Sequence, residues 1–465
     1  MTIQTVILDG FKSFRDRTEV TLGDLTILAG ANSSGKSTIM QALLLMKQTL
    51  ESVFDPGPLL MSGPHVAFSD TAQMVWSAPG EQRDSITLGL VISEYGGSIG
   101  YEFAVQREKD EEGITPLPLR LAKRSRISRT TGAAWEGEGI TPLRLVKATI
   151  SKGLRSMTVS PDWNPEQQEQ FEEEFNRWKK NRSFSENEKL SLEPEFERDR
   201  FFLFVTFRVR NETKVIDWFY PQSEHFVRNY IANSLRRIIH VPGLRGNPRR
   251  TYPVTAVERH FPSPFPDYVA SVIAFWQRMG ASELKQLKND LRELGLTWNI
   301  EARRISDVEV EIQVARSPTG AGQPARDMVS VADVGFGLSQ SLPVAVALLA
   351  ARPDDLVYLE QPEIHLHPRA AYQMSRLIHR AVMRGVQVVV ETHSELLLLG
   401  LQELVAAQQF GAKRVMLHWL QRDEQGASRL TSRELDKHGG FGDVPVDFGA
   451  VSLEAMHNYL TAAGE

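Results

Sequence analysis

The stretch DLTILAGANSSGKSTIMQALLLMKQTL, residues 24–50, decides the fold of this chain. It opens with the apolar residues Leu25, Ile27 and Leu28, which predict a buried β-strand, and it closes with apolar residues at helical spacing. Between the two stands GANSSGKS, residues 30–37, with the spacing G-x-x-x-x-G-K-S of a phosphate-binding loop. Because this loop requires a strand before it and a helix after it, the stretch predicts an α/β fold with a phosphate site at the helix start.

Each residue type in this loop has a physical purpose. Gly30 and Gly35 let the backbone wrap closely around phosphate oxygens, and the helix start offers free N–H groups at its positive end. Lys36 places a cation on the terminal phosphates, and Ser37 offers a hydroxyl to magnesium. The alternative, a glycine–serine turn that only caps a buried helix, is disfavoured because the flanking pattern is the one that a nucleotide site needs.

Composition limits the class of protein. The 465 residues are enough for two or more domains, and 42% of them are hydrophobic. A net charge of −5 argues against a basic protein that coats nucleic acid, so any DNA contact would need a local patch. The absence of cysteine excludes disulfides and fits a reducing compartment. No signal peptide is expected at the N-terminus, and the longest apolar runs, such as residues 342–351, are too short to span a bilayer. The sequence therefore predicts a cytoplasmic protein.

Two β-rich runs flank DGFKSFRD, residues 9–16, and predict a hairpin that leads into the strand of the loop. Within this segment, Phe11 and Phe14 could lie in the core or stack on bases, and the core is favoured.

A second strand pattern, in DDLVYLEQPEIHLHP (residues 354–368), ends in a carboxylate. Glu360 is placed to hold magnesium directly or through water, Glu363 follows three residues later, and a helix is expected over 369–383. Polar residues at the carboxyl ends of parallel strands build ligand sites in α/β sheets.

Two further segments carry polar residues at such positions. GVQVVVETHSELLLLGL, residues 385–401, predicts a buried strand followed by His393, which could reach a γ-phosphate. A lone histidine is more often structural, but its place after a strand end favours function. VSVADVGFGLSQSLPVAVALLA, residues 329–350, has Gly335, Gly337 and Ser339 before an apolar helix, whose first amides they would expose to an anion.

The segments GFKSF, GANSSGKST, GFGLSQ, EQPEIHLHP and ETHSE, in this order, resemble the motifs of ABC-class ATPases of the SMC/OLD-like group. Similar chains are the ATPase subunits of antiviral systems such as Septu and PARIS. The resemblance covers roughly residues 1–50 and 230–400, and IIHVPGLRGNPRRTY (238–252) resembles a Pro-Leu-Arg motif of the group. It implies an ABC-type P-loop NTPase head with a mixed sheet, split by a β-rich and helical insertion.

The resemblance also implies the cofactors ATP and Mg²⁺ and a set of site residues. It gives the Walker B acid position to Glu360, which with Ser37 would hold the metal, and the switch position to His393. It implies that the signature residues contact the γ-phosphate bound to a second copy, so the ATPase would work as a head-to-tail dimer or a higher homo-oligomer. The residues that it assigns to nucleotide binding are Gly30, Asn32, Ser33, Ser34, Gly35, Lys36, Ser37, Thr38, Gly335, Gly337, Ser339 and Gln340.

One position departs from the ABC pattern, because Gln361 stands where most ABC proteins have a catalytic glutamate. An amide cannot take a proton, although it can hydrogen-bond a water. Either Glu363 replaces the base, or the protein binds ATP tightly and Gln361 only positions the water. Both alternatives suit a switch whose ATP-closed state is the signal. We expect slow hydrolysis, with Glu360, Glu363, Gln361 and His393 as the catalytic candidates.

The predicted organisation has four parts. Residues 1–80 form an N-terminal ATPase lobe, 81–230 an insertion, 231–435 a C-terminal ATPase lobe that includes a helical segment at 265–300, and 436–465 a tail that ends in a short helix.

Inside the insertion, 81–158 predict a small antiparallel sheet. The charged segment 164–200 predicts a short amphipathic helix, marked by the aromatic stripe Phe171, Phe175 and Trp178. A surface helix is favoured over a docking helix for a partner, and the segment is too short for an SMC coiled-coil arm. A helix is also expected at 282–295 and a strand at 413–423.

Two features stay open at this stage. Gln73 and Gln82 are both candidates for the Q-loop. The arginines Arg245, Arg249 and Arg250 could bind DNA phosphates, bind a neighbouring subunit or support the nucleotide site as a packed turn, and the packed turn is slightly favoured.

The leading functional hypothesis is an ATP-driven oligomeric switch or sensor that controls a separately encoded effector, a nuclease, in prokaryotic antiviral defence. DNA or a phage protein is the candidate trigger, and no membrane partner is expected. The alternatives are an SMC-like DNA-repair or DNA-clamp ATPase, a transporter motor, and a scaffold that does not hydrolyse ATP. The short insertion and acidic charge argue against the clamp, and GFKSF with HLHP argues against the motor.

Overall fold

The computed structural model divides the chain into two compact units. The first unit comprises Met1–Thr21, Thr38–Arg236 and Glu424–Ala427, and the second comprises Leu22–Ser37, Arg237–Asp423 and Ser428–Glu465. The structure describes residues 2–94, 97–107, 143–152, 155–160, 169, 171–182, 190–211, 215–219, 222–318, 327–442 and 457–461.

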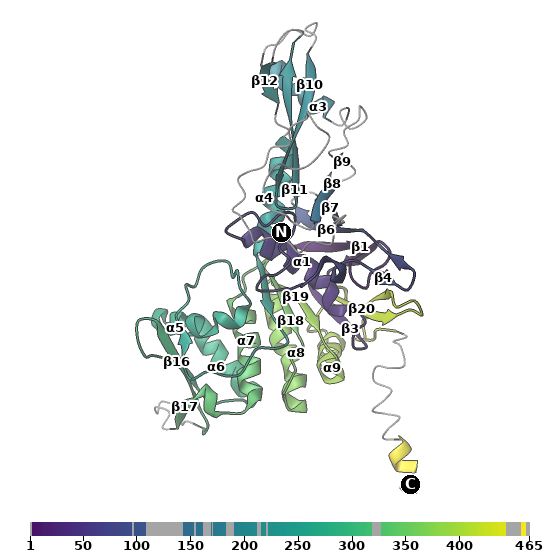
Figure 1. Cartoon of the computed structure of the whole chain (residues 1–465). Coiled ribbons are helices and arrows are strands. Elements are labelled where there is room, and N and C mark those ends of the chain that lie inside the picture. Colours follow the sequence, from purple (N-terminus) through teal and green to yellow (C-terminus); the bar gives the residue numbers. More distant parts are fainter. Residues whose placement is uncertain are drawn as a thin grey trace. The chain divides into compact units, whose positions relative to one another are not determined.

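The second unit is built on a mixed six-stranded sheet (Figure 1). Its order is β13 (Ile238–Val241), β18 (Leu356–Glu360), β19 (Gln387–Glu391), β3 (Leu25–Gly30), β20 (Val415–Arg422) and β21 (Ser428–Glu434). All neighbours are parallel except β20 and β21. Strands β18, β19 and β3 are almost wholly buried, which explains their continuous apolar runs. The predicted α/β class with a mixed sheet is confirmed.

Helices of the second unit follow the predicted pattern. They are α5 (Val269–Met279), α6 (Ser282–Glu293), α7 (Phe336–Ala350), α8 (Pro368–Met383) and α9 (Glu395–Ala406). Gly280 and Gly295, after α5 and α6, both have the left-handed backbone that stops a helix. The apolar faces of these five helices pack with the strands in one core. Burying each large aliphatic side chain in this core contributes about 1.5–3 kcal/mol.

A small antiparallel sheet completes this unit. It consists of β14 (Tyr252–Pro253), β16 (Glu309–Ala315) and β15 (Ile300–Arg304), with β17 (Met328–Ser330) paired to β16. Single-turn helices lie at Phe265–Asp267, Val331–Asp333 and Ala412–Arg414. This sheet was not predicted, because its strands are short and separated by charged loops.

The first unit contains an antiparallel six-stranded sheet of order β2 (Thr18–Thr21), β1 (Ile3–Asp9), β6 (Ser85–Glu94), β7 (Gly97–Arg107), β8 (Leu143–Lys152) and β9 (Arg155–Val159). The hairpin at the N-terminus is confirmed, and Phe11 and Phe14 are fully buried as expected. The sheet predicted for 81–158 is confirmed as antiparallel over its described residues, but it is not separate from the hairpin, because β1 pairs with β6. Residues 108–142 of that prediction lie outside the described residues.

Residues 164–200 hold more structure than predicted. The amphipathic helix is α3 (Glu172–Asn181), and Phe171 before it is fully buried against Phe207. Strand β10 (Ser191–Asp199) pairs with β11 (Phe202–Arg210), which pairs with β12 (Val215–Phe219). Strand β10 was not predicted, because the segment is highly charged. The alternation of Glu193, Glu195 and Glu197 with other residue types is nevertheless a strand pattern.

The remaining elements of the first unit are β4 (Ser77–Ala78), β5 (Glu81–Gln82), α4 (Gln222–Arg236) and the single turn Thr71–Gln73. The two Q-loop candidates therefore lie at Gln73 in that turn and Gln82 on β5. Helix α1 (Lys36–Glu51) begins in the second unit and continues in the first. In the tail, residues 457–461 are helical as predicted, and 443–456 lie outside the described residues.

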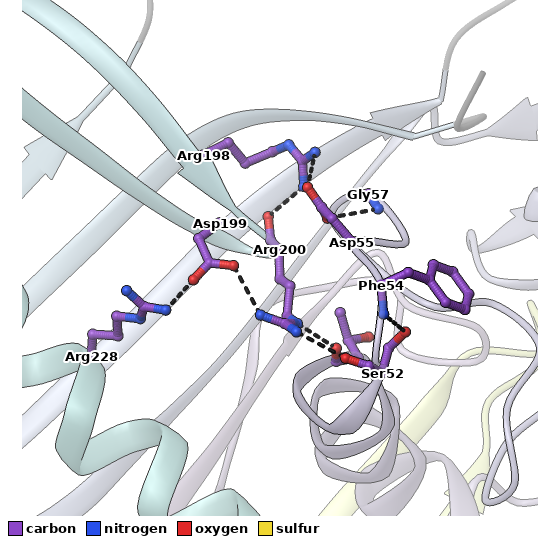
Figure 2. Close-up of polar contacts among 9 residues, drawn as sticks. Ser52, Phe54, Asp55, Gly57, Arg198, Asp199, Arg200 and Arg228 are labelled. Carbon is purple, nitrogen blue, oxygen red and sulfur yellow. Dashed lines mark hydrogen bonds and ion pairs between the residues drawn. The ribbon is translucent and has the colours of Figure 1, made fainter. Parts of the chain in front are cut away.

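The turn between β10 and β11 holds the end of α1 through arginines (Figure 2). The Arg200 guanidinium donates to the carbonyls of Thr49 and Ser52, at 2.8 and 2.9 Å, which are orphan acceptors at a helix end. Arg198 pairs with Asp55 at 2.8 Å, just beyond α1. We call this group the arginine clasp. Arg200 adopts a left-handed φ of 57°, a strained conformation for a residue other than glycine.

Candidate active site

The glycine-rich loop lies between the end of β3 and the start of α1, as predicted. Gly30 and Gly35 have φ of 135° and 102°, which side-chain-bearing residues rarely adopt. A Cβ on Gly30 would lie 2.2 Å from the carbonyl oxygen of Leu420 on β20. Only glycine therefore fits at Gly30, where the loop leaves the sheet.

Lys36 is buried beneath the loop. Its ammonium donates to the carbonyl oxygens of Gly30 and Ala31, at 3.1 and 2.8 Å, and only 4% of the residue is exposed. Burial lowers the pKa of Lys36, and the nearby charge of Glu391 opposes this shift. A desolvated cation held by neutral carbonyls at a helix start is an arrangement that an anionic phosphate would stabilise.

The outer side of the loop is supported from strands that follow much later in the sequence. Arg422 on β20 donates to the carbonyl of Ser33 at 2.8 Å, and Ser428 on β21 donates to the carbonyl of Ser34 at 2.6 Å. Asn32 and Ser33 are exposed, whereas Ser34 is buried. Thr38 is buried in the first turn of α1. The loop backbone is thus held in shape before any ligand arrives.

Ser37 contacts a carboxylate that the sequence reasoning did not include in the site. Its hydroxyl donates to Oε1 of Glu391, the last residue of β19, at 3.0 Å. The other oxygen of Glu391 accepts from the Tyr358 hydroxyl at 2.9 Å. Burial raises the pKa of Glu391, while these two hydrogen bonds oppose the shift. The quoted segment ETHSE contained the signal, since Glu391 ends a buried strand.

Glu360 ends β18 as predicted, but its side chain does not bond to Ser37. Its Oε1 lies 3.1 Å from Nε2 of His240 on β13, and its Oε2 accepts from the backbone N–H of Gly243 at 2.9 Å. Burial would raise the pKa of Glu360, yet the bonds from His240 and Gly243 outweigh it and lower the pKa. Glu360 therefore remains ionised, with both oxygens held from the β13 side.

The segment after Glu360 contains backbone strain. Gln361 has a φ of 45°, and a left-handed residue other than glycine costs about 1–2 kcal/mol. Its N–H donates to the carbonyl of Glu391 at 2.7 Å, so the turn is tied to β19. Strain of this kind concentrates at functional sites, where the surrounding structure fixes it.

The two carboxylate oxygens of Glu363 differ in their hydrogen bonds. Its Oε1 accepts from the Thr392 hydroxyl at 2.6 Å and from the His393 N–H at 3.2 Å. Its Oε2 is buried, and no partner for it exists among the described residues. Burial raises the pKa of Glu363, and its hydrogen bonds oppose the shift. A buried carboxylate oxygen without a partner is a position where a water would gain a strong hydrogen bond.

His393 follows β19 with Thr392 and stands before α9. Its pKa is lowered by burial and then by the charge of Lys36, which places the imidazole within electrostatic range of the loop lysine. A neutral imidazole near Lys36 can donate one hydrogen bond to a phosphate oxygen.

The glycine–serine segment forms the start of α7, as predicted. Gly335 is the residue before the first turn and, being glycine, offers no side-chain acceptor to the first amides of the helix. The Ser339 hydroxyl donates back to the Phe336 carbonyl at 3.0 Å. A Cβ on Gly337 would lie 3.1 Å from the His365 carbonyl, so the helix start lies close to the turn after β18.

Arg245 joins this helix start to the end of β18. Its guanidinium donates to the carbonyls of Gln340, Glu360 and Gln361, at 3.0, 2.6 and 3.1 Å. The Gln340 amide donates in turn to the Gly246 carbonyl at 2.9 Å and is buried. Burial lowers the pKa of Arg245 to about 10, although Glu363 and Glu360 oppose the shift. Arg245 is therefore a packed arginine that supports the site, whereas Arg249 and Arg250 are exposed.

Two family models match this chain. One, described as "AAA domain, putative AbiEii toxin, Type IV TA system", matches residues 167–399, half of the chain. The chain belongs to this AAA-domain family. A second, an AAA ATPase domain, matches residues 1–200. No curated protein matches the chain.

Solved structures of SMC heads are similar to this AAA protein over most of its length. The SMC head domain from Thermotoga maritima is 14% identical, with a TM-score of 0.42, and the match covers 94% of this chain and 100% of that chain. An Smc head bound to the C-winged helix domain of ScpA is 11% identical, with a TM-score of 0.47 and coverages of 94% and 99%. An Smc head from Pyrococcus furiosus, bound to the C-terminal domain of ScpA, is 10% identical, with a TM-score of 0.40 and both chains fully covered.

ATPases of this kind use ATP with Mg²⁺, and the oxygen donors of the AAA site fit that metal. Within the part of the chain that the structure describes, no cluster of three or more His, Cys, Asp or Glu side chains could hold a metal by itself. Magnesium does not need one, because it is usually bound by one or two carboxylates together with phosphates and water. Ser37 with the carboxylates at the ends of β18 and β19 meets this requirement.

Among the described residues of this AAA protein, no helix is long and apolar enough to cross a membrane.

Proposed function

We propose that the chain binds Mg²⁺–ATP, hydrolyses it slowly, and acts as a nucleotide-driven oligomeric switch that controls a separately encoded effector in prokaryotic antiviral defence. The observation that carries the nucleotide part is Lys36, a buried cation at the start of α1 whose hydrogen-bond partners among the described residues are the loop carbonyls of Gly30 and Ala31. Ser37 follows it in the loop, and the same unit holds two carboxylates at strand ends, Glu360 and Glu391, together with Glu363. We assign the binding of the phosphates to the loop residues 30–37. We assign Thr38 to the support of the first turn of α1.

Slow hydrolysis follows from the groups available to orient water. Gln361 carries an amide, which can hydrogen-bond a water but cannot accept its proton. The Oε2 of Glu363, which has no partner among the described residues, is the atom best placed to accept a proton. The raised pKa of Glu363 increases the fraction of protonated carboxyl, which cannot act as a base. Neutral His393 stabilises the γ-phosphate. When bound, Mg²⁺ supplies positive charge to the phosphates, and Ser37 and Glu360 are the residues that we assign to hold it.

We propose that a second copy completes the site. The start of α7, with Gly335, Gly337 and Ser339, has no side-chain cap and would contribute amides to the γ-phosphate held by the other copy. The apolar side chains of Leu244 and Phe336 are 91% and 55% exposed beside these segments, which supports an interface there. The side-chain amide of Gln340 donates to the Gly246 carbonyl, so we assign Gln340 to holding this segment in place.

The defence part rests on the family description, which names a toxin of a type IV toxin–antitoxin system. We propose a nuclease encoded nearby as the effector, DNA or a phage protein as the trigger, and the cytoplasm as the location. The ATP-bound assembly would be the signal, because slow hydrolysis keeps it closed.

The test combines binding and assembly. Titration with a fluorescent ATP analogue should give saturable, magnesium-dependent binding that Lys36→Ala abolishes. Mass photometry should show larger assemblies with ATP than without, and Gly337→Ala should remove them while leaving ATP binding intact. Binding that survives Lys36→Ala refutes the nucleotide site. Unchanged assembly with ATP refutes the switch, and full protection against phage without the neighbouring nuclease gene refutes the effector.

A further inference from the structure

Two glutamates end neighbouring strands at the same level of the sheet. Glu360 of β18 and Glu391 of β19 are register partners in a parallel pair, so their side chains leave the same face. In the strand order, β19 lies between β18 and β3, which carries the phosphate loop. Glu391 is therefore the carboxylate on the strand next to the loop.

Every oxygen of these carboxylates has its own partner. Glu391 bonds Ser37 and Tyr358, whereas Glu360 bonds His240 and the N–H of Gly243. The bonds of Glu360 lead toward β13, at the edge of the sheet, and those of Glu391 lead to β3 and β18. The two acids are thus held in different directions.

Tyr358 fixes the orientation of Glu391. The ring of Tyr358 is fully buried and stacks on His240, with 5.3 Å between centroids, and its hydroxyl reaches Glu391. Since a locked rotamer and a second hydrogen bond fix the carboxylate, its Oε1 can direct the serine hydroxyl.

We propose that Glu391 is the positioning residue that takes the Ser37 hydrogen and so turns the serine lone pairs toward Mg²⁺. A serine hydroxyl has one hydrogen and two lone pairs, so an acceptor for the hydrogen decides where the oxygen points. By sequence position this partner would be Glu360, but the structure gives it to the acid next to the switch histidine. The inference rests on the proposed ATP function, which it deepens.

The test is a double-mutant cycle on magnesium affinity. The readout is the ratio of the ATP dissociation constant in EDTA to that in Mg²⁺, measured by equilibrium binding on the whole chain. Loss of an outer hydrogen-bond partner of a metal ligand typically costs about 10–100-fold in metal affinity. Ser37→Ala and Glu391→Leu, which leaves no acceptor for the Ser37 hydrogen, should each reduce the ratio by about tenfold, and the double variant should lose no more than either single variant.

Glu360→Gln is the contrasting variant. Because Glu360 does not bond to Ser37, the fold-reductions of the ratio in Glu360→Gln and Ser37→Ala should multiply in their double variant. If the losses of Ser37→Ala and Glu391→Leu multiply in the double variant, or if Glu391→Leu leaves the ratio unchanged, the inference is overturned. Tyr358→Phe keeps the buried ring and removes only its bond to Glu391; it should reduce the ratio about threefold, and an unchanged ratio there counts against the inference even if Glu391→Leu does not fold. ATP binding by the unaltered chain that ignores Mg²⁺ would instead refute the proposed function.

Discussion

Replacing Arg245 by methionine should destabilise the second unit by about 1.5–6 kcal/mol. Methionine keeps the aliphatic volume but removes three hydrogen bonds from a cation to the carbonyls of Gln340, Glu360 and Gln361. Each such bond contributes about 1.5–3 kcal/mol. Burial lowers the Arg245 pKa to about 10 from 12.5 against the opposing charges of Glu363 and Glu360, which corresponds to a net cost of about 3 kcal/mol for the charged form, and the substitution removes this cost.

Urea unfolding followed by tryptophan fluorescence would measure this loss, at an unchanged dependence on urea. Arg249→Met is the matched control, because Arg249 belongs to the same segment but is exposed, and it should change stability by less than about 0.5 kcal/mol. The ATPase rate of Arg245→Met should also fall, since the carbonyls that Arg245 holds belong to the residues at the end of β18. Equal unfolding midpoints for the two variants would refute the reasoning.

Three further outcomes are expected. Glu363→Gln should lower phosphate release by about 10²–10⁴-fold. In the unaltered chain the rate should fall as pH drops through the Glu363 pKa, which burial raises above 4.5, because the protonated carboxyl cannot act as base. Gly30→Ala should abolish ATP binding and lower the melting temperature, since its Cβ would lie 2.2 Å from the Leu420 carbonyl. Arg200→Gly should relieve backbone strain yet increase amide exchange at the end of α1, because the clasp bonds to Thr49 and Ser52 are lost.

The glycine and arginine substitutions each have a control within the chain. Gly246 also has a positive φ, 71° against 135° at Gly30, but a Cβ there meets no atom within 4 Å, so Gly246→Ala should cost only about 1–2 kcal/mol and keep ATP binding. Arg210→Met removes an arginine from β11 that pairs with Glu193 at 3.4 Å, and it should leave exchange at α1 unchanged. An acid limb that is identical in Glu363→Gln, or protection of α1 that is identical in Arg200→Gly, would contradict the corresponding prediction.

Local patterns in the sequence were enough to predict the elements around the site. The run before Gly30, the run before Glu360 and the apolar strand before Thr392 are continuous because their strands are buried on both faces. Helix starts were equally local, since Gly335 precedes α7 and Pro368 is the first residue of α8. The position of the loop and of the strand ends followed directly.

The partition of strands between the two units could not be read from such patterns. Hairpin β1–β2 precedes the phosphate-loop strand in the sequence, yet β1 pairs with β6 more than seventy-five residues later. Strand β10 was missed because glutamates alternate along it, and a charged segment predicts exposure more strongly than it predicts strand. Pairing between distant segments is decided by burial in three dimensions, which composition does not encode.

The hydrogen bond between Ser37 and Glu391 could not be predicted from the sequence, for a related reason. A motif places an acid by its distance from a strand end, and by that criterion Glu360 and Glu391 are equivalent, since each is the last residue of a buried strand. What separates them is the order β18–β19–β3, which puts Glu391 one strand from the loop and Glu360 two strands away. Neighbouring strands lie about 4.8 Å apart, so one strand of separation is within reach of a glutamate and a serine that point toward each other, whereas two strands are not without an intervening water or ion. The 3.0 Å bond between Ser37 and Glu391 follows from this spacing.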